Sequence, residues 1–170
     1  MGLTVRFIPK KETMDKLSRL YPDFKPHYVE AVQALFQLSN DLEKAMEVHF
    51  ARHHCSRARY LILMVLYHCT ETKMHPNEIA KQLNVTRGNM TGIIDGMIRD
   101  GFVVKHQDKN DRRQVWIAPT EKAEKFLSKM LPDHYKRLAL LMSAVSKSEI
   151  DTFIQTARKL NQSMGVFLEE

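Results

Sequence analysis

The sequence predicts a mainly α (α+β) protein, a winged helix-turn-helix flanked by long N- and C-terminal helices. Three observations carry this prediction. Two amphipathic segments separated by a tight turn lie between His75 and Gly101. Two β-prone runs with a charged segment between them follow directly, as in a hairpin. Longer helix-forming segments begin near Pro26 and Thr120, on either side of this central region.

The first helix of the central motif is expected to begin at Pro76, because a proline at the first helical position loses no hydrogen bond. Ile79, Ala80 and Leu83 then form one apolar face. Asn84 follows where the chain must turn, and asparagine tolerates the left-handed conformation. These residues predict a short helix that ends in a tight turn.

The second helix is expected to be capped by the Thr86 hydroxyl and to end at Gly101. Its apolar residues recur at the spacing of one buried helical face. They are Met90, Ile93, Ile94 and Met97. The opposite face then holds Gly88, Thr91, Gly92, Asp95 and Arg99. Each of the two outward glycines costs about 1 kcal/mol relative to alanine in a helix. A close approach to a partner would offset that cost, and tolerated sequence drift is the alternative.

Residues 102–104 and 115–117 are the β-prone runs of the expected hairpin, and residues 108–113 form its charged tip. Upstream, Lys10 to Tyr21 is expected to be a short helix, which Pro22 and Pro26 separate from a long one. This long helix should fade at residues 53–55. Its apolar stripe consists of Val32, Leu35, Phe36, Leu42, Met46, His49 and Phe50.

Ser56 can cap the next helix, in which residues 60–67 are apolar all round and are expected to be buried on every side. A buried strand is the alternative for this run, because periodicity does not separate the two. After Thr120 a further helix contains Pro132, which should kink it or split it near Met130. Ser146 and Glu149 form a capping box that starts the last helix.

The last helix carries a clean apolar stripe consisting of Ile150, Phe153, Ile154, Ala157, Leu160, Met164 and Phe167. A single small domain would not cover this stripe together with that of the first long helix. Large exposed apolar faces mark partner surfaces, so a two-fold homodimer built from the terminal helices is expected. A monomer whose two ends fold onto each other is the alternative.

These elements divide the chain into four parts. Residues 1–24 are an N-terminal extension, and residues 25–55 are the first long helix, with dimerisation and linker roles. Residues 56–119 are the winged helix-turn-helix DNA-binding region. Residues 120–170 are the C-terminal dimerisation helices.

Composition bounds the function. The chain has 170 residues and a formal net charge of +6, which is compatible with nucleic acid without being diagnostic. It lacks an apolar run long enough to span a membrane, an N-terminal signal core and any CxxC pair, so a cytoplasmic protein is expected. Since GxSxG, HExxH and Gly-rich phosphate loops are absent, neither an enzyme nor a cofactor is expected.

Residues 77–103, NEIAKQLNVTRGNMTGIIDGMIRDGFV, and the run from Asp111 to Lys122 resemble the multiple antibiotic resistance regulator (MarR) family. The Asp111-x-Arg113 wing tip followed by a strand and Thr-Glu-Lys is the most specific part of the match. The resemblance implies a dimeric transcription regulator, usually a repressor, on double-stranded DNA. Such regulators are often released by a small ligand or by thiol oxidation. A dimer would read a pseudo-palindromic operator.

The outward side chains at the start of the second helix of the motif are the expected DNA contacts: Thr86, Arg87, Asn89 and Thr91. Arginine and asparagine make bidentate contacts to guanine and adenine, and threonine suits phosphate or the thymine methyl. The family more often has a basic or polar residue where this chain has Gly92. In the wing, Lys109, Asp111, Arg112 and Arg113 are expected to act together. By resemblance, Arg113 enters the minor groove and Asp111 orients the arginines, while Arg112 meets phosphate.

What the protein senses is left open among three alternatives. His49 and His53 lie one helical turn apart and could hold a metal, although no metal is expected. Cys55 could be a redox switch if a nearby protonated histidine lowered its pKa. The family favours a small aromatic effector. The candidate pocket residues are His49, His53, Arg59, Tyr60 and Met64. A winged-helix module that binds protein is the competing class of function.

Overall fold

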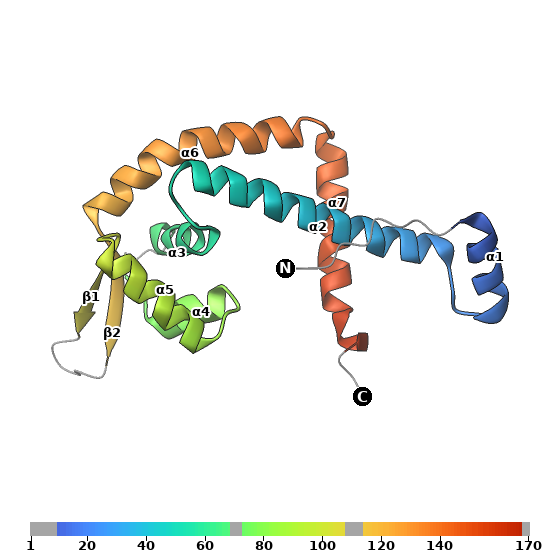
Figure 1. Ribbon diagram of the computed structural model, residues 1–170, viewed down its shortest axis with the longest axis horizontal. Helices are drawn as coiled ribbons and strands as arrows, with labels where there is room; N and C mark the ends of the chain where they lie inside the picture. The colour runs from blue at the N-terminus through green and yellow to red at the C-terminus, as the bar shows by residue number, and fades with distance from the viewer. Residues whose placement is uncertain (1–9, 69–72, 108–113, 168–170) are drawn as a thin grey trace. The chain divides into compact units, whose positions relative to one another are not determined.

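The computed structural model describes residues 10–68, 73–107 and 114–167. It divides into two compact units, Met1–Thr120 and Glu121–Glu170. The described part is mostly helical with one two-stranded antiparallel sheet (Figure 1), and this confirms the expected mainly α fold class. Among the described residues, none of the helices has the length and apolar character that crossing a membrane requires.

The first unit begins with α1 (Lys11–Leu20) and the long α2 (Pro26–Arg52), as the prolines between them predicted. Pro26 occupies the first turn of α2, where its missing N–H leaves no bond unmade. His49 and Phe50, at the C-terminal end, are the buried residues of α2. The chain leaves the helix through His54, whose φ of 53° is left-handed.

Helix α3 (Arg57–Tyr67) begins where the Ser56 hydroxyl accepts a hydrogen bond from the Arg59 N–H at 3.2 Å. The helical prediction for this apolar run is therefore right, and the strand alternative is wrong. Burial on every side is wrong as well. Ile62, Leu63 and Leu66 are fully buried, but Tyr67 is 57% exposed. Residues 60–66 are all buried or half-buried, so the prediction fails only at the last residue of the run.

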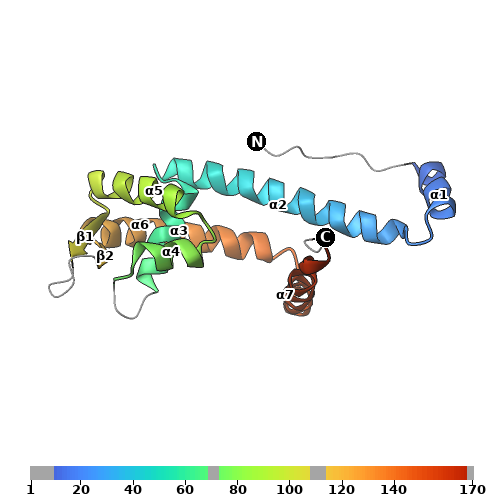
Figure 2. The same cartoon turned by 90° about the horizontal axis from the view of Figure 1, so that it is seen from below.

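Helices α4 (Pro76–Gln82) and α5 (Arg87–Arg99) form the helix-turn-helix (Figure 2). Asn84 in the turn has a φ of 51°, as predicted. The Thr86 hydroxyl accepts from the Asn89 N–H at 3.4 Å and caps α5. Gly101, with a φ of 73°, ends this helix in a conformation that favours glycine.

Strand β1 (Val103–Gln107) pairs antiparallel with β2 (Val115–Pro119), with Val103 opposite Pro119 and Gln107 opposite Val115. The strands are longer than the apolar runs that predicted them, because backbone pairing continues through polar residues. Met74, just before α4, exchanges two backbone hydrogen bonds of 2.9 Å with Ile117. The hairpin is therefore tied to the start of the helix-turn-helix.

The second unit contains α6 (Glu121–Met142), α7 (Lys147–Gln162) and the short 3-10 helix η1 (Met164–Phe167). A kink or a split near Met130 was expected at Pro132. Helix α6 continues through this residue, so the split is wrong, because losing one backbone hydrogen bond did not interrupt the helix. The predicted capping box is confirmed. The Ser146 N–H donates to Glu149 Oε2 at 2.8 Å, and the Glu149 N–H donates back to the Ser146 hydroxyl at 3.3 Å.

Candidate nucleic-acid interface

Helix α5 presents a polar, exposed surface at its N-terminal end. Arg87, Asn89 and Thr91 are exposed, while Met90 and Ile94 are buried beneath them. The buried pair anchors the helix to the first unit, because apolar side chains on one face fix the helix about its axis. The predicted outward and inward faces are therefore both present.

The two threonine hydroxyls of this surface differ in the hydrogen-bonding capacity that remains available to DNA. Thr86 Oγ1 accepts the capping hydrogen bond from Asn89, so its own O–H is left for a phosphate oxygen. The Thr91 hydroxyl donates to the Arg87 carbonyl oxygen at 3.0 Å, so its proton is already used. The Thr91 oxygen can still accept a hydrogen bond, and its methyl suits a thymine methyl.

Gly88 and Gly92 line the same exposed face. A Cβ atom built at either position would meet nothing within 4 Å. The packing of the chain itself therefore does not require glycine at these positions. What glycine provides here is the closest possible approach of another molecule to the α5 backbone.

The predicted wing-tip residues Lys109, Asp111, Arg112 and Arg113 lie outside the described residues. The strands that lead to them are described, and Gln107 and Val115 form the last pair of the ladder. The described part of the hairpin therefore begins directly after α5 and extends to this pair.

An ion pair that the sequence did not reveal joins α3 to the end of α5. Arg59 Nη2 contacts a carboxylate oxygen of Asp100, the C-cap residue of α5. The same guanidinium lies over the ring of Phe102, 5.0 Å from the ring centre. Arg59 is an expected effector-pocket residue whose role there stays a prediction, and its guanidinium contacts residues at the junction between α5 and β1.

A second group holds β2 against α4. A ring N–H of His75, at Nδ1, donates to the Val115 carbonyl oxygen at 2.7 Å. Its ring stacks on Trp116, with centroids 3.7 Å apart and planes 29° apart. Lys73 Nζ lies 4.9 Å from the centre of the Trp116 ring. Sequence reasoning missed this group, because its members are some 40 positions apart.

The candidate effector residues come from α2 and α3. The rings of His49 and His53 lie 5.0 Å apart, and His49 is 7% exposed. Tyr60 is buried and stacks on Phe50 at 4.7 Å. Three of the candidates therefore lie where the C-terminal end of α2 approaches α3, and their role as a pocket stays a prediction.

The fifth candidate, Met64, lines a cavity of about 300 Å³ between α3 and α4. Its other lining residues are Leu61, Val65, His68, Met74, Gln82 and Leu83. His49, His53, Arg59 and Tyr60 are not among the residues that line this cavity.

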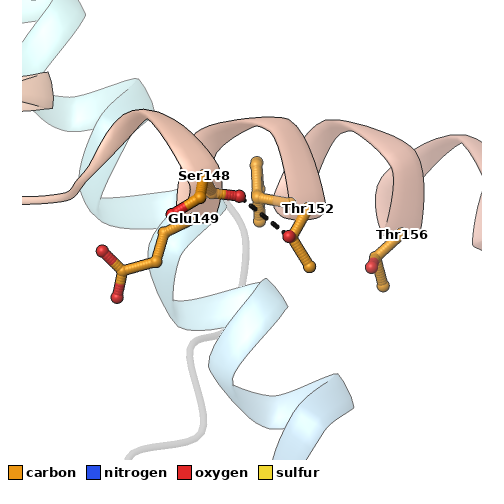
Figure 3. A pocket seen from close by; sticks show the side chains of 5 residues that line it. Ser148, Glu149, Thr152 and Thr156 are labelled. Atoms are coloured by element: carbon orange, nitrogen blue, oxygen red, sulfur yellow. Dashed lines mark hydrogen bonds between the residues drawn. The ribbon is translucent and has the colours of Figure 1, made fainter.

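In the second unit, a shallow depression runs along α7, lined by Ser148, Glu149, Thr152, Phe153 and Thr156 (Figure 3). The Thr152 hydroxyl donates to the Ser148 carbonyl oxygen at 2.8 Å, within the helix. The depression belongs to one exposed helix face and carries no chemistry of its own.

Cys55 is 6% exposed, and its thiol donates to the Ser56 carbonyl oxygen at 3.3 Å. Burial raises the pKa of the Cys55 thiol, and the nearby positive charge of Arg59 only partly opposes this. A raised pKa keeps the thiol protonated, and thiols react as thiolates. The environment of Cys55 thus disfavours the redox alternative.

The fold and this interface define a class, the winged helix-turn-helix DNA-binding regulators. The comparisons with known proteins give the family. The model of the MarR family matches residues 55–115. Over 165 residues the chain is 29% identical to the HTH-type transcriptional repressor YetL of Bacillus subtilis (strain 168), covering 97% of this chain and 99% of that one. Over 140 residues it is 30% identical to the uncharacterized HTH-type transcriptional regulator YkoM of Bacillus subtilis (strain 168), covering 80% and 90%. The chain belongs to the MarR family of transcriptional regulators, whose members found here are regulators and not enzymes.

Solved structures share the fold. The complex of Staphylococcus aureus MepR with DNA has a TM-score of 0.69 and 18% identity, covering 84% of this chain and 100% of that one. The complex of NadR with 4-hydroxyphenylacetate has a TM-score of 0.60 and 18% identity, covering 75% and 89%. At this identity the two structures establish a common fold.

Proposed function

We propose that this MarR-family protein is a homodimeric, sequence-specific repressor that leaves its operator when a small aromatic ligand binds. The observation that carries the DNA-reading part is the surface of α5. There the exposed side chains of Arg87, Asn89 and Thr91 stand on the buried anchors Met90 and Ile94. A helix in the major groove needs one buried face and one face that reaches base edges.

Dimerisation is supported by the apolar side chains that the single chain leaves in solvent. On α2, Tyr28 is 61% and Phe36 is 66% exposed, and on α7 Phe153 is 50% exposed. None of the residues of α7 is buried. A second copy offers a matching apolar surface through two-fold symmetry. Two copies would then present two α5 helices to two half-sites of a pseudo-palindrome.

Repression and release by an aromatic ligand are supported by analogy and by local chemistry. YetL, similar over nearly the whole chain, is a repressor. NadR, of the same fold, holds 4-hydroxyphenylacetate. In this chain His49, His53 and Tyr60 bring aromatic rings together at the end of α2. The raised pKa of Cys55 makes a ligand the better effector hypothesis than thiol oxidation.

The proposal is tested by selecting duplexes from a random-sequence pool with the purified protein. We expect a pseudo-palindrome with half-sites about one helical turn apart. Affinity for the selected duplex should fall steeply with salt, because phosphate contacts release counterions. Light scattering should give the mass of two chains. If no sequence is enriched from the pool, or if binding does not depend on salt, a protein-binding module would be favoured instead.

The ligand is tested with 4-hydroxyphenylacetate and salicylate as probes in a thermal-shift assay and in a duplex-release assay. Stabilisation of the protein and release of the selected duplex should occur together, because a ligand favours the state that it binds. His53→Ala should weaken both effects. A lack of stabilisation by aromatic acids would contradict this part of the proposal and leave DNA reading intact.

A further inference from the structure

We propose that Arg59 is a positioning residue that sets the angle between α5 and the wing through Asp100 and Phe102. The proposal rests on the DNA-reading role of α5 proposed above. Arg59, which the sequence also offers as an effector-pocket candidate, contacts both Asp100 and Phe102 at the junction where α5 ends and β1 begins. Arg59 makes these contacts within its own chain, and we expect them to affect the specificity of DNA binding.

The geometry of the pair is local to this junction. The Arg59 side chain is 22% exposed, and the Asp100 side chain is 49% exposed. Phe102, over which the guanidinium lies, is 9% exposed. An exposed ion pair alone stabilises little. Here the same guanidinium also covers an aromatic face, which adds an attraction that depends on its position.

Both charges oppose the dipole of their own helix. Arg59 is the third residue of α3, where the helix N-terminus carries partial positive charge. Asp100 is the C-cap residue of α5, where the helix C-terminus carries partial negative charge. Each residue is therefore unfavourable for its own helix. The ion pair between Arg59 and Asp100 offsets these two unfavourable dipole interactions. It connects the two helices and stabilises neither helix by itself.

The other side of the same junction is also held. The Thr120 hydroxyl donates to the Gly101 carbonyl oxygen at 2.7 Å, and the Thr120 N–H donates to the Phe102 carbonyl oxygen at 3.1 Å. Arg59 thus contacts the side chains of residues 100 and 102, and Thr120 donates hydrogen bonds to the backbone carbonyls of residues 101 and 102. Helix α5 ends at this junction and β1 begins there. These contacts therefore set the orientation of α5 relative to the wing, and both must fit the same duplex.

The test uses charge reversal in the full-length protein, with the duplex selected by the wild type and a random duplex as probes. Arg59→Glu and Asp100→Lys should each lower the ratio of specific to random affinity about tenfold, as the ion pair and the cation–π contact are lost. The double variant Arg59→Glu/Asp100→Lys should restore the ratio to within about threefold, because the pair re-forms with reversed charges.

Asp100→Lys separates positioning from general electrostatics. It adds positive charge, so counterion release alone would raise its affinity for every duplex. Positioning requires the affinity for the selected duplex to fall while random binding is kept or raised. An equal rise on both duplexes would overturn the proposal.

Arg57 provides the matched control for Arg59. It lies in the same first turn, and its Nη1 pairs with Glu43 Oε1 of α2 at 2.8 Å, away from α5. Arg57→Glu causes the same change of charge and should leave the specificity ratio unchanged. An equal loss in Arg57→Glu and Arg59→Glu would reject the positioning role.

Thermal melting of each variant shows whether a loss of specificity arises only because the variant is unfolded. Because each reversal suits its helix dipole, melting temperatures should be kept or slightly raised. If Arg59→Glu does not fold, Asp100→Asn removes the charge with little change of shape, and an unchanged ratio there would overturn the proposal. If the wild type selects no sequence, the proposed function fails before the variants are compared.

Discussion

The ring of His75 stacks on the ring of Trp116, with centroids 3.7 Å apart and planes 29° apart, and so joins the start of α4 to the second strand of the wing. The hydrogen bond from His75 Nδ1 to the Val115 carbonyl oxygen fixes the same strand at its first residue. The wing is therefore attached to the helix-turn-helix at both of its ends, through β2 here and through the α5–β1 junction.

Trp116 is the single tryptophan of the chain, so its fluorescence reports on the wing. His75→Ala should increase its quenching by acrylamide and weaken binding to the selected duplex, because both the ring stack and the hydrogen bond are lost. Emission spectra and quenching constants give the measurement. His106, which faces Trp116 across the ladder, is exposed, so His106→Ala serves as the control. Equal quenching in all three proteins would show that the stack does not hold the wing.

Gly92→Ala should stabilise the protein by up to about 1 kcal/mol and weaken DNA binding. The stability gain is expected because a Cβ there meets nothing within 4 Å of the chain. The loss of affinity is expected because the methyl group would stand between α5 and the duplex. Gly96→Ala is the control, since that position is half-buried and its Cβ would lie 3.9 Å from Arg99 Nη2. Tighter binding by Gly92→Ala would contradict close approach at this face.

Asn89→Ala should cost about 1–3 kcal/mol of affinity for the selected duplex and little for a random one, as expected when one base contact is lost. The cap of α5 should survive, because Thr86 accepts from the backbone N–H of Asn89 and not from its side chain. Arg113→Ala should show a loss of the same size through the minor groove. Fluorescence anisotropy at one fixed salt concentration measures both variants. A uniform loss on all duplexes would assign Asn89 to phosphate instead of bases.

The Cys55 thiol should resist labelling at neutral pH in the folded protein and react rapidly in denaturant. Burial raises its pKa above the ordinary 9.0, so the folded state disfavours the thiolate. The contribution to stability is fully present below about pH 9 and is lost as the pH rises through the folded pKa, since the unfolded chain loses its proton first. Cys55→Ala should therefore flatten the decline in stability above pH 9. Labelling is done in a Cys69→Ser background, and fast native labelling would revive the redox alternative.

Phe153→Glu should convert the proposed dimer to monomers, because it places a charge on the apolar stripe of α7. The side chain is 50% exposed in the single chain, so the monomer itself should tolerate the change. Gln155→Glu, on the other side of α7, adds a charge outside the stripe and should leave the mass unchanged. Light scattering at several concentrations distinguishes them, and a Phe153→Glu variant that stays dimeric would place the subunit interface elsewhere.

The sequence by itself determined the elements of this protein and their order. Ser56, Thr86 and Ser146 cap the helices they were expected to cap, and Asn84 and Gly101 take the left-handed conformations their turns require. These features depend on neighbours within three or four positions, so they can be read along the chain. The buried face of α5 follows from its periodicity in the same way.

The tertiary structure alone decided what Arg59 and His75 contact. Their partners Asp100 and Val115 stand 41 and 40 positions away, and no local pattern encodes those distances. It also decided that Tyr67 is exposed at the open end of an apolar run and that α6 continues through Pro132. The physical reason is common to the two contacts and to the exposure of Tyr67: burial and pairing depend on which elements approach in space, and a pattern read along one segment contains only that segment.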